Sequence, residues 1–477
     1  MLKFVALKKN LFYSFCNILI NTLYPLAVFP YISRVLSVSS IGTYNYYNIL
    51  FSYIVIFASF GVSLYASKEI GKYQKDISRK IQLANELLII SIFNAFLALI
   101  FIVLPVVYFA PATDKLIAII FCIMIVANSI SVEWYYVATE NQKFIFYRNL
   151  IFKSISMFLI FYLIKDNNDL LIYVLIVVLS LLINAIVNFL KLVAEIKNSF
   201  RLYLNFNHYK GLIVIFLVEI TFRYYGMGDV AILEKFVTRE ELGFLTFSLS
   251  IFNIISSFLK IIATTLLPRV SLMIHTNNLH DFHVLIKKTF SLIFLISFPA
   301  ILFLFFGSDA LAILFGGTKF VASSNMIKAF CPLVLTSSII NTFIFQILYP
   351  MGKTRSIITS FIFSILINIV LNLLLIPKIF SYSLIFSSIL SNVLLIVILL
   401  FIEKEILIIN KLFSKDISKY FVAFIASFIL MIVLSKLKID TYNITAISSG
   451  LLLYILITII FKDSILYKIT TNILQRR

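Results

Sequence analysis

The chain has 477 residues, of which 61% are hydrophobic and only 13% are charged. Ordinary soluble domains carry about 25% charged residues, so the composition excludes a soluble globular protein and predicts an all-α polytopic membrane protein. Lysine and arginine outnumber aspartate and glutamate by 40 to 21, which gives a net charge of +19. Because these basic residues lie in loops between hydrophobic runs, we interpret them as topology signals and expect no nucleic acid as a partner.

Hydrophobic runs long enough to cross a bilayer recur along the chain. A helix rises about 1.5 Å per residue, so roughly 20 residues span a hydrocarbon core of about 30 Å. Between Pro30 and Tyr73, a helix end, a polar turn at 37–42 and a run at 41–67 lead to basic residues. The first run is too long for a signal peptide, so we expect it to be retained. The fourteen predicted spans are 10–36, 41–67, 82–109, 115–138, 147–164, 170–190, 211–235, 242–267, 288–306, 328–349, 355–376, 382–402, 417–435 and 443–461.

The basic residues are divided unevenly between the two sides of this arrangement. With both termini in the cytoplasm, 27 of the 40 lysines and arginines fall on the cytoplasmic side, 9 on the outer side and 4 within spans. Cytoplasmic loops of membrane proteins carry such an excess of basic residues. The distribution therefore predicts that both termini are cytoplasmic.

The sequence also contains a weak internal repeat. An offset of 201 residues pairs Ile41 and Gly42 with Leu242 and Gly243. In both copies the glycine belongs to a short polar turn before a long predicted helix. The offset equals six predicted spans, and paired six-helix lobes with the substrate between them are a common transporter plan. We predict an N-terminal lobe at 1–200, a C-terminal lobe at 201–405, and two extra helices with a tail at 406–477.

Features that would indicate an enzyme are incomplete. Gly352-Lys353-Thr354 matches the end of a phosphate-binding loop, but Ile347 stands where that motif needs a glycine. The longest predicted outer loop, Gly307 to Met326, is too short to fold as a catalytic domain. We therefore expect no enzymatic activity and no cofactor.

Metal-ligating residues are equally sparse. The three cysteines have no CxxC spacing, so we expect them to be buried small side chains without a disulfide or metal. The four histidines fall in predicted cytoplasmic loops, where we expect solvated side chains rather than a metal site. These residues are Cys16, Cys122 and Cys331, and His208, His275, His280 and His283.

Three blocks of sequence resemble one transporter family. The blocks are PYISRVLSVSSIGTYNYYNILFSYIVIFASFGVSLYASKEIGKY at 30–73, EWYYVATENQKFIFYRNLIFKSISMFLIF at 133–161 and MGDVAILEKFVTREELGFLTFSLSIFNIISSFLKIIATTLLPRVS at 227–271. In content and order they are similar to the Wzx-type polysaccharide (O-antigen) flippases of the MOP superfamily, which includes the MATE-like exporters. The resemblance extends through the twelfth predicted span.

The resemblance implies a function. It implies alternating access between two lobes and, as cargo, an undecaprenyl-pyrophosphate-linked oligosaccharide repeat unit of O-antigen or capsular polysaccharide in the bacterial inner membrane. We expect a proton or sodium gradient to drive transport, and a polymerase and a chain-length regulator as further partners. A lipid II flippase, a multidrug exporter and, from another class, a membrane O-unit polymerase stay open as alternatives.

An anionic, sugar-bearing cargo favours a cationic, hydroxyl-lined cavity, and charges within spans usually face a cavity or a partner. The predicted substrate-binding residues are Arg223, Lys260, Arg34, Lys153, Tyr44 and Asn45. The residues predicted for ion coupling or gating are Glu219, Asp229, Glu133, Glu140 and Arg148.

Each candidate also has a structural alternative that the sequence leaves open. Glu219 and Arg223 are one helical turn apart and are spaced for an ion pair. Glu133 and Glu140 are placed to pair with Arg148 or Lys153. The remaining alternatives are snorkelling for Lys153 and Lys260, interfacial anchoring for Arg34, helix capping for Asp229, and an aromatic belt for Tyr44.

Overall fold

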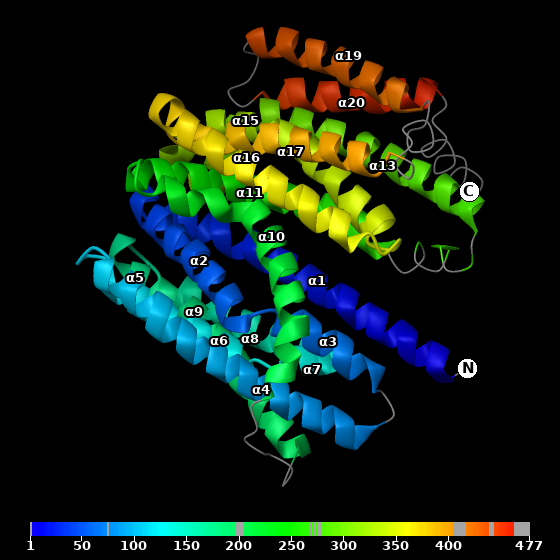
Figure 1. The fold of residues 1–477 in the computed structure, drawn as a ribbon. Helices are drawn as coiled ribbons and strands as arrows, with labels where there is room; N and C mark the ends of the chain where they lie inside the picture. The colour runs from blue at the N-terminus through cyan, green and yellow to red at the C-terminus, as the bar shows by residue number, and fades with distance from the viewer. Residues whose placement is uncertain are drawn as a thin grey trace. The chain divides into compact units, whose positions relative to one another are not determined.

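The computed structural model describes residues 2–73, 76–196, 205–266, 270, 273–274, 276, 278–404, 416–437 and 443–461. These residues form helices joined by short turns, with no strand among them, so the all-α fold is confirmed (Figure 1). Eleven helical segments within this part of the chain are long and apolar enough to cross a membrane. The other three predicted spans fall on the α2–α3 pair, on α10 and on α20. The protein is a multi-pass membrane protein.

The chain divides into two compact units, Met1–Gly243 and Phe244–Arg477. The division comes after α10, because this helix packs against α2 and α3 of the first unit. The helices of the first unit are α1 (Leu2–Val35), α2 (Val38–Ser59), α3 (Val62–Lys72), α4 (Ile77–Ala98), α5 (Leu104–Phe109), α6 (Lys115–Ile130), α7 (Glu133–Ala138), α8 (Gln142–Leu163), α9 (Leu170–Ile196), α10 (Tyr209–Leu233) and the first turn of α11 (Arg239–Thr265). A π-helical turn, Leu99–Val103, joins α4 to α5.

The second unit begins within α11 and ends with two helices that pack on each other. Its further helices are α13 (Leu279–Phe306), α14 (Ser308–Gly316), α15 (Ser324–Thr342), α16 (Thr354–Ile379), α17 (Tyr382–Ile402), α19 (Asp416–Lys436) and α20 (Ile444–Ile460). The Tyr454 hydroxyl of α20 donates to the Leu295 carbonyl of α13 at 3.2 Å. The last two predicted helices are therefore packed onto the second unit.

The second predicted span is broken in the middle. Phe60 and Gly61 have φ of 45° and 79°, and they separate α2 from α3. A Cβ on Gly61 would lie 2.8 Å from the Phe216 backbone nitrogen and 2.9 Å from the Leu212 oxygen, so the break is where α10 approaches most closely. The turn predicted at 37–42 is present but shorter, because α1 ends at Val35 and α2 already begins at Val38.

Other boundaries also differ from the sequence-based prediction. α8 begins at Gln142 instead of 147, and α13 at Leu279 instead of 288, so both helices include residues assigned to cytoplasmic loops. The predicted outer loop Gly307–Met326 was wrong, because it contains α14 and a 3-10 helix, Thr318–Ser323. The first turns of α8 and α13 are polar, so a prediction based on apolar runs does not include them in the helices.

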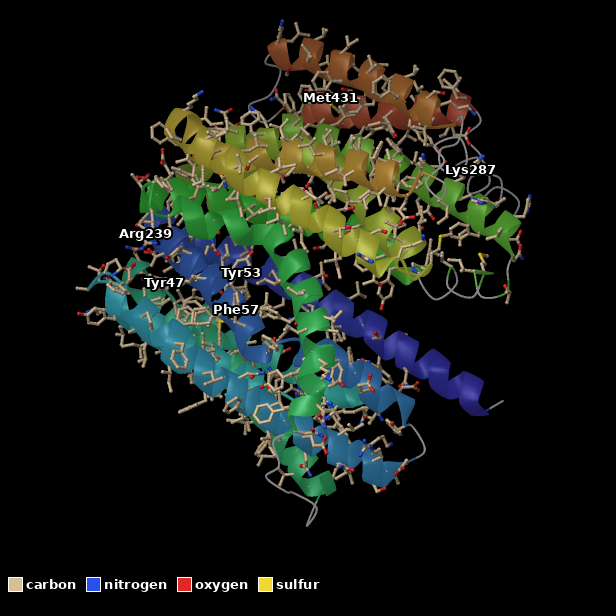
Figure 2. The ribbon with its side chains drawn as sticks, in the orientation of Figure 1. Tyr47, Tyr53, Phe57, Arg239, Lys287 and Met431 are labelled. Atoms are coloured by element: carbon tan, nitrogen blue, oxygen red, sulfur yellow. The ribbon has the colours of Figure 1, made fainter. Side chains whose placement is uncertain are left out.

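The first turn of α11 is fixed to α2, α6 and α10 by an arginine. Nη2 of Arg239 lies 2.8 Å from Asp114 Oδ2 and 2.9 Å from Glu234 Oε1. The guanidinium also lies over the Tyr46 ring, 4.9 Å from its centroid, and the Tyr47 hydroxyl donates to Asp114 at 3.4 Å. Arg239 and Tyr47 accordingly lie at the same end of this unit (Figure 2). This end is the predicted outer end.

Candidate functional site

A break in the fourth predicted span organises the polar interior of the first unit. Val132 has φ of 37° and separates α6 from α7, which leaves the Ser131 carbonyl without a helical partner. The buried Asn188 side chain of α9 donates to this carbonyl at 2.6 Å. The Tyr136 hydroxyl in turn donates to the backbone carbonyl of Asn188 at 3.2 Å. The break is therefore held open by hydrogen bonds that a continuous helix would not need.

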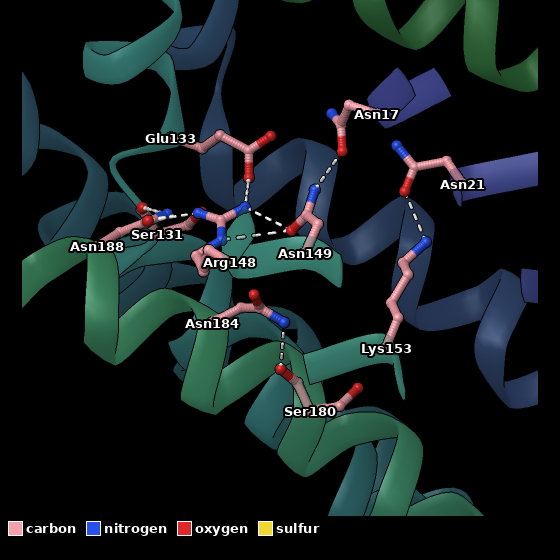
Figure 3. A network of polar contacts seen from close by, with 10 residues as sticks. All are labelled: Asn17, Asn21, Ser131, Glu133, Arg148, Asn149, Lys153, Ser180, Asn184 and Asn188. Carbon is pink, nitrogen blue, oxygen red and sulfur yellow. Dashed lines mark hydrogen bonds and ion pairs between the residues drawn. The ribbon is translucent and has the colours of Figure 1, made fainter. Parts of the chain in front are cut away.

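Arg148 joins this break to α8. Its guanidinium donates to Glu133 Oε2 at 2.6 Å, to Asn149 Oδ1 at 2.7 Å and to the Asn188 side-chain oxygen (Figure 3). The Arg148 side chain is 3% exposed, whereas Glu133 is 42% exposed. The predicted ion pair between Glu133 and Arg148 is thus present, and its exposed end is the carboxylate. Its gating role stays a prediction.

A polar seam runs along the contact between α1 and α8. Its side-chain hydrogen bonds join Asn10 to Glu140, Asn17 to Asn149, Asn21 to Lys153 and Tyr24 to Ser156, with sequence separations of 130, 132, 132 and 132. A nearly constant separation means that the two helices run parallel, and the shared value of 132 fixes their register from Asn17 to Tyr24. Asn10, Asn17 and Tyr24 recur every seven residues, which keeps them on one helix face.

Lys153 differs from Arg148 in the partners that surround its charge. Nζ donates to Asn21 Oδ1 at 2.6 Å and lies 5.1 Å from the centroid of the Tyr24 ring. No described carboxylate comes within ion-pair distance of it. An ammonium group has three donors, and Asn21 is the acceptor of one of them among the described residues. Lys153 is thus a predicted substrate-binding residue whose described contacts leave room for an anionic ligand.

The hydrogen bonds that define the seam do not involve the other predicted substrate residues. Tyr44 lies within the packing of α2, α6 and α9, 4.7 Å from the Tyr173 ring and 6.0 Å from that of Phe121. Asn45 is half-buried on α2, and Arg34 is exposed in the last turn of α1. Lys260 belongs to the second unit, where Nζ lies 5.6 Å from the Phe345 ring centroid. Glu140 contacts Asn10 rather than either predicted cation.

The candidates on α10 are described only in part. Arg223 and Asp229 lie on this helix, but their side chains are outside the described residues, and so is the predicted Glu219–Arg223 pair. Glu219 itself accepts a hydrogen bond from the backbone of Leu64. Leu64 lies in the first turn of α3, whose amides have no partner within the helix. Glu219 therefore caps the helix that follows the Phe60–Gly61 break.

Sequence reasoning missed the amide residues of this network, namely Asn17, Asn21, Asn149 and Asn188. Asparagine is rare in an apolar span, and Asn10 and Asn17 stand seven residues apart. That spacing was the available signal for the seam on α1. No sequence signal pointed to Asn188, because its partner is a carbonyl freed by a break 57 residues away.

Comparison with known proteins agrees with this fold. A family model described as "Polysaccharide biosynthesis protein" matches residues 7–275, and the MatE model matches residues 215–374. The chain belongs to the polysaccharide biosynthesis protein family. A search of curated protein sequences found no match.

Solved structures of transporters share the fold of this family member. A lipid II flippase, MurJ, in an inward closed conformation superposes with a TM-score of 0.67 at 14% identity, covering 97% of this chain and 99% of that one. An inward-facing multidrug resistance MATE family transporter of the MOP superfamily gives a TM-score of 0.61 at 12% identity, covering 81% and 94%. At these identities the likeness establishes the fold alone.

Proposed function

We propose that this protein is a flippase that moves undecaprenyl-pyrophosphate-linked oligosaccharide repeat units, of O-antigen or capsular polysaccharide, across the bacterial inner membrane. Membership of the polysaccharide biosynthesis protein family supports a lipid-linked glycan as cargo. The observation that carries the proposal is Lys153, an intramembrane cation that no described carboxylate pairs with, beside a row of amides. No covalent step is involved.

The chemistry of the seam suits such a cargo. A pyrophosphate is an anion that must leave water during transport, and a positioned ammonium with free donors stabilises it there. Asparagine side chains offer both donors and acceptors, so they match the hydroxyl groups of sugars. Arg148 is less suited to direct contact, because Glu133, Asn149 and Asn188 already accept its hydrogen bonds.

We also propose the orientation and the setting. Both termini are cytoplasmic, as the excess of basic residues in the predicted inner loops indicates. A proton or sodium gradient supplies the energy, and the half-exposed Glu133 carboxylate beside Arg148 is a candidate coupling group. The flipped unit then passes to a polymerase and its chain-length regulator.

Loss of the protein tests the cargo. Deletion is expected to abolish surface polysaccharide and leave the lipid-linked unit on the cytoplasmic leaflet, with wild-type protein restoring both. Repeat units accumulated on the outer leaflet without polymerisation would identify a polymerase instead. Arrest of lipid II in the cytoplasmic leaflet would identify a lipid II flippase.

Substitution of Lys153 tests the site. Lys153→Gln is expected to remove most transport at normal membrane abundance, and Lys153→Arg is expected to keep part of it because the charge remains. Lys165→Gln is the matched control, because Lys165 lies just beyond the same helix and is exposed. Full activity of Lys153→Gln would exclude Lys153 from the site.

A further inference from the structure

A buried carboxylate lies in α4, away from the seam. Glu86 is 4% exposed and accepts three side-chain hydrogen bonds. Its Oε1 accepts from Gln82 Nε2 at 2.8 Å, and its Oε2 accepts from Asn205 Nδ2 at 3.0 Å. The third contact joins Oε2 to Nε2 of His208 at 2.7 Å. No part of the proposed transport site uses this group.

His208 lies directly before α10 and is enclosed by its partners. Its side chain is 11% exposed, so the solvated loop position predicted for it was wrong. Nδ1 lies 3.1 Å from the Tyr65 hydroxyl of α3, while Nε2 faces Glu86. Both ring nitrogens therefore have partners, one from each of two helices of the first unit.

This arrangement accommodates an additional proton without losing a contact. When the imidazole is neutral, Nε2–H donates to Glu86 and Nδ1 accepts from the Tyr65 hydroxyl. When the imidazole is protonated, Nδ1–H donates to the Tyr65 oxygen, and Nε2–H forms a charge-assisted bond to the carboxylate. A hydroxyl and a carboxylate are suited to both states, since the hydroxyl can donate or accept.

Among the described residues, the contacts of the pair are mostly with uncharged groups. Arg79 of α4 approaches only through Gln82, to which its Nη1 donates at 2.8 Å. Tyr65 is the titratable group that α3 presents, and Asn205 is the polar group from the segment before α10. Tyr209, the residue after His208, donates to Asn94 Oδ1 at 2.6 Å. Within the described residues, Glu86 and His208 are the charged pair of this cluster.

We propose that Glu86 and His208 form a proton-binding site that fastens the start of α10 to α3 and α4. The ligand is a proton from the predicted cytoplasmic side, and its binding converts the hydrogen bond between the neutral imidazole and the carboxylate into an ion pair. The contact is a close one, because a Cβ on Gly211 would lie 2.5 Å from the Tyr65 ring. Uptake of one proton therefore tightens the attachment of α10, and release of the proton loosens it.

The only tryptophan of the chain reports on this attachment. Trp134 is 6% exposed and packs in one apolar cluster with Ala66 of α3, Leu83 and Leu87 of α4, and Leu212 of α10. A change in how α10 is held alters the surroundings of this indole. Its emission is measurable in purified protein in nanodiscs without any cargo.

The experiment is a pH titration of Trp134 emission together with the thermal unfolding midpoint. Across a series of pH values, wild-type emission is expected to change in one step as the His208–Glu86 contact gains or loses the proton. The ion pair is present at the lower pH and lost at the higher, so the midpoint is expected to fall by about 2 °C as the pH rises. Both changes are expected to disappear in Glu86→Gln, which keeps the shape of the carboxylate, and in His208→Gln.

His280→Gln is the matched control, because this histidine is 88% exposed on the first turn of α13 in the second unit. It is expected to behave as wild type. Two results would overturn the proposal: no pH-dependent change in wild type, or the same change in His208→Gln. Because neither readout needs cargo, a wrong choice of glycan under the proposed function leaves this test intact.

Discussion

Gly42 and Gly243, which the internal repeat pairs at an offset of 201 residues, lie against each other in the structure. A Cβ on Gly42 would stand 2.2 Å from the Arg239 oxygen and 2.9 Å from the Gly243 nitrogen. A Cβ on Gly243 would stand 2.2 Å from the Val38 oxygen. The first turns of α2 and α11 thus cross with their backbones in contact, and only glycine fits at either position.

This crossing predicts that alanine is not tolerated there. In Gly42→Ala the methyl group would meet backbone atoms, which cannot move aside as a side chain can, so we expect a loss of about 2 kcal/mol in stability. The measurement is the thermal unfolding midpoint together with membrane abundance. Gly450→Ala is the control, because its methyl group would meet the flexible Met431 side chain, at 2.2 Å from Cε. Equal effects in the two variants would contradict this explanation.

An acid introduced beside Lys153 should impair transport without impairing folding. In Asn21→Asp the new carboxylate would stand where Oδ1 now accepts from Nζ, and so would neutralise the ammonium. We expect transport to fall about tenfold or more while abundance stays normal, because an added ion pair does not disturb packing. Transport and abundance would be measured against Asn17→Asp, whose acceptor role toward Asn149 is preserved. Unchanged transport in Asn21→Asp would show that the cargo does not need a free charge at Lys153.

The ion pair between Glu133 and Arg148 should act as a unit. In Glu133→Gln the buried guanidinium loses its charged partner, and we expect a loss of about 2 kcal/mol. This is less than the roughly 3–5 kcal/mol for a fully buried pair, because the carboxylate is half-exposed. In Glu133→Gln with Arg148→Gln no charge is left unpaired, so part of the stability is expected to return. The double-mutant cycle measures this coupling in thermal unfolding, and additive losses would show that the pair contributes little.

The topology predicts opposite results from two reporter fusions. A reporter active only outside the cytoplasm should be active when fused after Lys165 and inactive when fused after Arg201. α8 ends at Leu163 and α9 lies between the two fusion points, so they differ by one membrane crossing. The reverse pattern at both sites would invert the proposed orientation.

Much of the fold could be predicted from the sequence, because helix formation in a membrane depends on the local run of apolar residues and on the surrounding hydrocarbon. Apolar runs of bilayer length dictate helices, since unpaired backbone groups are costly in hydrocarbon. The Glu133–Arg148 pair could also be predicted from the sequence, because two opposite charges near one end of adjacent spans have few other partners. The outcome for Lys153 was different. Its sequence position allowed snorkelling, and only its contacts with Asn21 and Tyr24 showed how its charge is held.

The sequence by itself determined the class of protein, the order of its apolar runs and the charged residues that lie within them. The tertiary structure alone decided where the spans break and which polar groups meet. The break at Phe60 and Gly61 depends on the approach of α10, and the break at Val132 depends on a side chain of α9. The burial of His208 depends on Glu86, 122 residues earlier in the chain. Contacts of this kind join residues distant in sequence, and hydropathy, which is a property of neighbours along the chain, carries no information about them.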